Sequence, residues 1–80
     1  MAWREIVHED QLWRVDALAE RRAEERSWQL ILAFRSRANQ APKVLWAPYP
    51  LEATSKLSLF LQAGRITDAA LSHLLAERLR

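Results

Sequence analysis

The segment DALAERRAEERSWQLILAFRSRANQ, residues 16–40, changes character halfway and decides the fold class. Its first half is charged and rich in good helix formers, whereas its second half places large apolar residues at every other position. A continuous helix over residues 12–38 would put Arg22 and Arg26 on its apolar stripe. Strands fit better, because the even-numbered positions from 28 to 34 are then apolar and share one face. We therefore predict two strands joined by AERRAEERS, with an all-α helical bundle as the alternative.

The sequence before this segment continues the strand pattern. QLWRVDAL, residues 11–18, alternates apolar with polar or charged side chains and supplies the first of the two strands. WREIV, residues 3–7, could add another strand, with a turn at residues 8–10.

KVLWAPY, residues 43–49, predicts a third strand after the loop RSRANQAP, whose Asn and Pro are typical turn residues. In this strand we expect Val44 and Trp46 to face the core and Leu45 to face the opposite side. The sheet is expected to end at PYP, residues 48–50, because proline cannot donate to a strand ladder.

After Pro50 the apolar period becomes helical. Pro50 suits a first helical position, Gly64 suits the residue just beyond a last turn, and Thr67 suits an N-cap. We predict helices at about residues 50–63 and 67–79, joined as a helical hairpin. The apolar stripes are Ala53, Leu57, Phe60 and Leu61 in the first helix, and Leu71, Leu74, Leu75 and Leu79 in the second.

The expected fold is one small α+β domain over residues 1–80. It consists of a three-stranded antiparallel meander at about residues 3–47, four-stranded if WREIV joins, followed by the helical hairpin. Eighty residues bury one small core, and the chain has no cysteine to add a disulfide or a thiolate ligand. Chains of this size often gain stability by associating, so a homo-oligomer or a place in a larger assembly is expected.

Catalytic and cofactor sites find little support in the sequence. The single glycine excludes the glycine-rich loops that bind nucleotide phosphates, and no serine lies in a nucleophile elbow. HED, residues 8–10, reads best as a polar turn. His73 and Glu77 share a helix face, but a stable metal site needs three or four ligands. We expect no enzyme activity, no cofactor and no metal.

Localisation is expected to be cytoplasmic. The first eleven residues carry acids and no apolar run, which is unlike a signal peptide, and the longest apolar run, residues 30–34, is too short to cross a bilayer. The absence of cysteine agrees with a reducing compartment. The net charge is +2, which does not by itself indicate nucleic-acid binding.

A basic segment raises nucleic-acid binding as an alternative function. No acid occurs between Arg26 and Leu51, and aromatic residues are interleaved with the cations there, as in grooves for single strands. The candidate contacts are Arg26, Arg35, Arg37 and Lys43.

A protein partner is the favoured hypothesis. If both helices cover the face of positions 28–34, the second face of the sheet stays open and partly apolar, with a polar rim. The function predicted is that of a non-catalytic interaction or accessory module, which self-associates or docks on a larger protein. The predicted contact residues are Ile31, Ala33, Leu45, Arg35 and Arg37.

Overall fold

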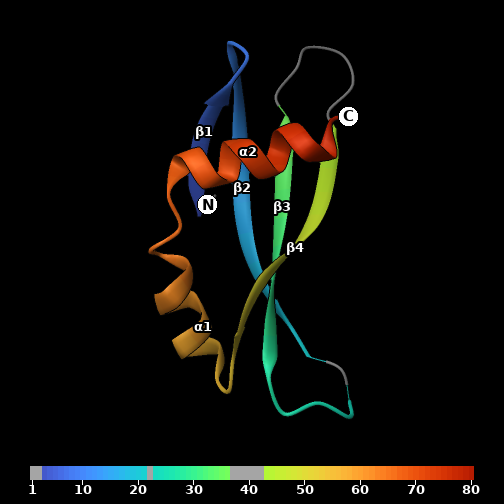
Figure 1. Ribbon diagram of the computed structural model, residues 1–80, viewed down its shortest axis with the longest axis vertical. Coiled ribbons are helices and arrows are strands. Elements are labelled where there is room, and N and C mark those ends of the chain that lie inside the picture. The colour runs from blue at the N-terminus through green and yellow to red at the C-terminus, as the bar shows by residue number, and fades with distance from the viewer. Residues whose placement is uncertain (1–2, 22, 37–42) are drawn as a thin grey trace.

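The computed structural model describes residues 3–21, 23–36 and 43–80, which form a four-stranded antiparallel sheet followed by two helices (Figure 1). The elements are β1 (Arg4–His8), β2 (Gln11–Glu20), β3 (Trp28–Ser36), β4 (Val44–Ala53), α1 (Lys56–Ala63) and α2 (Asp68–Arg78). The strands lie side by side in chain order. The α+β class is confirmed, with WREIV providing the fourth strand, and an all-α bundle is not supported.

The turn between β1 and β2 lies where the sequence placed it. His8 pairs with Gln11, so Glu9 and Asp10 form a two-residue loop, and their φ angles are 50° and 63°. Positive φ at both central residues is the requirement of a type I′ turn, whose twist matches that of the flanking strands. Neither residue is glycine, so the turn carries some backbone strain.

One face of the sheet holds the core, and both helices cover it (Figure 1). Leu30, Leu32 and Phe34 of β3 are fully buried, and partly buried Trp28 packs against the same cluster. The inward orientation predicted for the even positions of β3 is therefore confirmed. α2 contacts β1 and β4, whereas α1 contacts β2, β3 and β4 nearer the other end of the sheet.

Both helices begin at a hydroxyl cap. Ser55 Oγ accepts a hydrogen bond from the Ser58 amide at 3.1 Å, and Thr67 Oγ1 accepts one from the Ala70 amide at 3.1 Å. The Thr67 cap is confirmed, whereas the prediction of a helix starting at Pro50 is wrong. Gly64 follows the last turn of α1 as expected, with right-handed φ and ψ of −61° and −17°.

The buried side of α1 differs from the prediction. Leu59 and Ala63 are fully buried against the sheet, whereas Leu57 and Leu61 point to solvent and are 72% and 68% exposed. Because α1 starts at Lys56, and its apolar side chains spread over a wide arc on which Leu57, Leu59 and Leu61 all lie, its inward face is set by tertiary packing rather than by the period. In α2, buried Leu71 and Leu75 follow the predicted stripe.

β4 extends through PYP to Ala53, beyond residue 47, where the sequence predicted the sheet to end. Prolines are tolerated here because β4 is an edge strand, so the missing N–H groups of Pro48 and Pro50 can face away from β3. A register shift opposite Gln29 and Leu30 accommodates the second proline.

Arg4 ties the first strand to the connection between the helices. Its Nη1 donates to the carbonyl oxygen of Ile66, and its Nη2 donates to that of Gly64 at 3.4 Å. Nη1 also lies 3.5 Å from an Asp68 carboxylate oxygen. These contacts join positions sixty or more residues apart and hold the start of α2 against β1.

Candidate functional site

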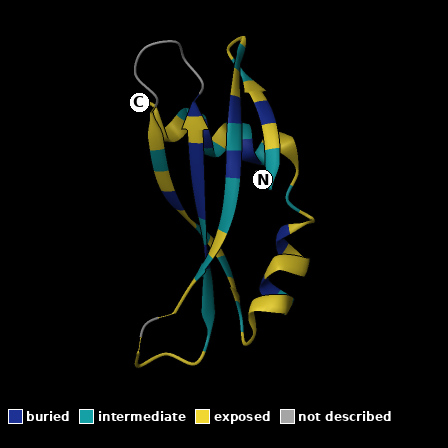
Figure 2. Cartoon of the chain, turned by 180° about the vertical axis from the view of Figure 1, so that it is seen from behind, coloured by how far each residue is buried: buried dark blue, intermediate teal, exposed yellow. Residues whose placement is uncertain are grey.

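The candidate site is the side of the sheet that the helices leave uncovered, which we call the outer face. Figure 2 looks onto it, with α2 behind the sheet and α1 beside the lower part of the sheet. The strand register places its residues in cross-strand rows, each with one residue from β2, β3 and β4. The rows are Arg14, Arg35 and Val44; Asp16, Ala33 and Trp46; Leu18, Ile31 and Pro48; and Glu20, Gln29 and Glu52.

The centre of the outer face is apolar. Trp46 is 55% exposed and Leu18 is 40% exposed, and half-buried Ile31 lies between Leu18 and Pro48. Ala33 is fully buried between its cross-strand neighbours, so it forms a shallow position next to the tryptophan. A large exposed aromatic side chain beside a small residue gives the surface an uneven shape that a partner can fit, and burial of the aromatic ring contributes desolvation energy.

Charges lie on both sides of this centre, and they differ in sign. Toward the turn of the first hairpin, Arg35 pairs with Asp16 at 3.5 Å and Arg14 with Glu5 at 3.8 Å, each through Nε, which leaves their Nη groups available. The sheet therefore presents two arginines at this end.

At the other end, a hollow of about 190 Å³ is lined by Glu20, Glu25, Gln29 and Glu52. None of these acids takes part in an ion pair among the residues that the structure describes. This end therefore carries three acids that have no ion-pair partner in the described part of the chain.

The predicted contact residues lie on both faces of the sheet, and one of them lies outside the described residues. Ile31, Ala33 and Arg35 lie on the outer face, whereas Leu45 pairs with Phe34 and packs against the core. The prediction that Leu45 faces outward is wrong, because β4 has the opposite parity from the one expected. Arg37 lies outside the described residues.

The same parity corrects the expectation for two other β4 residues. Val44 and Trp46, expected in the core, lie on the outer face and are exposed. A signal for this was present in the sequence. Positions 45, 47, 49 and 51 are all apolar, whereas 48, 50 and 52 are Pro, Pro and Glu. A strand that continues through PYP therefore has its odd-numbered residues on the core face, which a strand ending at residue 47 does not reveal.

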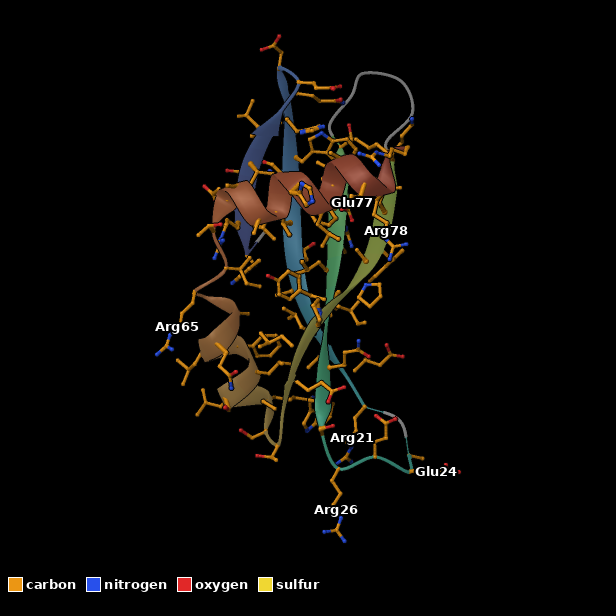
Figure 3. The ribbon with its side chains drawn as sticks, in the orientation of Figure 1. Arg21, Glu24, Arg26, Arg65, Glu77 and Arg78 are labelled. Carbon is orange, nitrogen blue, oxygen red and sulfur yellow. The ribbon has the colours of Figure 1, made fainter. Side chains whose placement is uncertain are left out.

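The basic residues proposed for nucleic acid do not form one cluster among those described. Arg26 lies in the loop before β3 and its side chain points away from the sheet (Figure 3). Arg35 and Lys43 lie at the other end of β3. The nine residues of β3 span about 30 Å when extended, so these cations are far from Arg26. The ring of Trp28 lies 4.8 Å from the Arg21 guanidinium and 4.6 Å from the Lys56 ammonium, so cations of the chain itself already cover it.

The histidines occupy exposed or peripheral positions. His8 ends β1 beside the Glu9–Asp10 turn, and His73 forms an i,i+4 pair with Glu77 at 3.0 Å on the solvent side of α2. Across residues 3–21, 23–36 and 43–80, no three His, Asp or Glu side chains are grouped to hold a metal ion. Neither of the two helices in this described part is long and apolar enough to cross a membrane.

Comparison of the chain with protein-family models, with curated proteins and with solved structures finds no match. The outer face itself is therefore the feature from which a function can be proposed.

Proposed function

We propose that this chain is a non-catalytic protein-interaction module whose binding surface is the outer face. The observation that carries the proposal is an exposed tryptophan, Trp46, on the edge strand of an open sheet face with charged residues at both ends. Monomeric proteins rarely leave such apolar patches uncovered, and tryptophan and arginine are the residues that most often dominate binding energy.

The construction of the sheet also supports binding. Each outer-face residue alternates along its strand with a residue packed in the core, such as Leu32 between Ile31 and Ala33. The backbone under the surface is therefore held in place before a partner arrives, which reduces the entropy lost on binding. Apolar contacts would provide desolvation, and Arg14 and Arg35 would direct hydrogen bonds to carboxylates at the rim.

The cytoplasm is the compartment that we propose for this module. The chain has no cysteine, whereas small secreted domains commonly depend on disulfides.

Site-specific photocross-linking tests the proposed function. One variant carries p-benzoylphenylalanine in place of exposed Pro48 on the outer face, and a matched variant carries it in place of exposed Leu61 on α1. After irradiation in extract, we expect protein adducts from position 48 that disappear when Trp46→Glu is added. Equal adducts from both positions, or none from position 48, would contradict the proposal.

A further inference from the structure

The outer face is complementary to itself, and we infer that its partner is a second copy of this chain, packed face to face. This inference rests on the proposed function and names the partner. It is carried by the arrangement of charges and side-chain sizes about one row of the sheet, by the two sheet edges, and by the area available.

The row Ala17, Leu32 and Ala47 divides the outer face into two halves. One half holds Arg14 and Arg35 with their ion-pair partners Glu5 and Asp16, and the other holds the acids Glu20 and Glu52, which have no ion-pair partner among the described residues. These three residues point into the core, and the outer-face rows lie symmetrically on either side of them along the strands. One half ends in the arginine row and the other half ends in the acidic row that borders the hollow. A surface with this pattern attracts a copy of itself turned end for end.

A two-fold axis above this row, perpendicular to the strands and lying between the two sheets, brings opposite halves together. On β2, Glu20 then faces Arg14 of the partner subunit. On β4, Trp46 faces Pro48 of the partner subunit. The Glu20 contact therefore joins unlike charges, and the Trp46 contact joins a large side chain with a smaller one.

The edges of the sheet disfavour association by strand addition. β4 lacks two N–H groups at Pro48 and Pro50, so it cannot complete a ladder with a further strand there. β1, the other edge, has five residues and begins with the charged pair Arg4 and Glu5. Association through the open face is therefore the favoured geometry.

The area of the outer face fits a dimer of moderate affinity. Four residue rows spaced about 6.7 Å apart on four strands about 4.8 Å apart give a footprint of about 500 Å² per copy once side-chain margins are included. Specific interfaces bury roughly 800 Å² per partner, and smaller ones are weak or transient. We therefore expect dissociation in the micromolar range, on the order of 1–100 µM.

Sedimentation equilibrium over concentrations of about 1–500 µM tests the inference. The wild type is expected to approach twice the 9.3 kDa mass of the chain, and Trp46→Glu to weaken dimerisation by at least about 100-fold, because two copies of the anchor are lost. Leu61→Glu, an equally drastic change at the exposed side of α1, is the matched control and should stay within about twofold. If Trp46→Glu fails to fold, Pro48→Glu at the same edge replaces it.

Charge reversal tests the two-fold arrangement itself. Glu20→Arg and Arg14→Glu, each alone, should weaken dimerisation by about tenfold, because each creates two repulsive contacts per dimer. Combined in one chain, they recreate both attractive pairs and should restore the dimer to within about threefold of wild type. A double variant as weak as the single variants would overturn the arrangement.

Two further outcomes separate this inference from the proposed function. A wild type that stays monomeric throughout overturns the second copy as the partner, while cross-links of another mass from position 48 would still support a protein-interaction module. Dissociation by Leu61→Glu but not by Trp46→Glu would place the contact on α1 and overturn both.

Discussion

Arg4→Met should lower the free energy of unfolding by about 2–3 kcal/mol, because Arg4 is the main polar tie between the first strand and the helices. Its bond to the Ile66 carbonyl is partly shielded from solvent, since the arginine side chain is 21% exposed, and a charged donor in such a bond contributes about 2 kcal/mol. The Gly64 bond and the Asp68 contact are exposed and add about 0.5 kcal/mol each at most. Methionine retains the apolar stem but not the donors.

Urea unfolding followed by tryptophan fluorescence, at one fixed protein concentration, measures this loss. For a chain of this size the melting temperature should fall by about 10–20 °C. Arg65→Met is the control, because the Arg65 side chain points away from the molecule (Figure 3) and should change stability by less than about 0.5 kcal/mol. Asp68→Asn separates the ion pair from the carbonyl bonds and should cost less than about 1 kcal/mol. A loss from Asp68→Asn that equals the loss from Arg4→Met would refute the reasoning.

Three other changes test the local structure by the same unfolding measurement. Leu59→Ala should cost about 3 kcal/mol because Leu59 is fully buried, whereas Leu61→Ala should cost less than about 0.5 kcal/mol, and equal losses would contradict the observed orientation of α1. Thr67→Ala should cost about 1 kcal/mol through loss of the α2 cap, while Thr67→Ser should keep most of it; a neutral Thr67→Ala would argue against that cap. Glu9→Asn with Asp10→Gly should raise stability by about 1 kcal/mol, since both positions have positive φ; a decrease would contradict a type I′ turn.

The sheet could be predicted where alternation was long and one-sided. In β3 the even positions carry large apolar residues and are buried, so the pattern and the tertiary structure agree. In β2, Trp13 and Val15 alternate with Arg14 and Asp16, and burial follows the same alternation. A short strand followed by a turn could also be predicted near the N-terminus, because HED separates two alternating segments.

The errors arose where the local pattern was ambiguous. When β4 is taken to end at residue 47, both of its faces are apolar, so the sequence does not show which face meets the core. Trp46 was therefore assigned to the core and Leu45 to the outer face, the reverse of the observed arrangement. The resolving information lay in the proline-containing half of the strand, which an edge position tolerates. In α1 the apolar residues of KLSLFLQA cover a wide arc of the helix, so the choice of Leu59 over Leu57 depends on contact with the sheet.

Arg4 belongs to a different class of residue that the sequence could not assign. Its partners lie at Gly64 and beyond, sixty or more positions away, and no spacing rule joins them. The candidate interaction surface was found in part, through Ile31, Ala33 and Arg35, because the open face follows directly from the alternation of β3. Its anchor, Trp46, became identifiable with the register of β4.

Isotope-filtered NMR on a mixture of labelled and unlabelled chains tests the central claim most directly, because it detects contacts between copies and ignores those within one copy. The account predicts intermolecular contacts from the Trp46 ring to Pro48 of the partner subunit. Intermolecular contacts confined to Leu57 and Leu61 of α1, or none at concentrations of about 500 µM, where a dimer in the expected affinity range predominates, would contradict it.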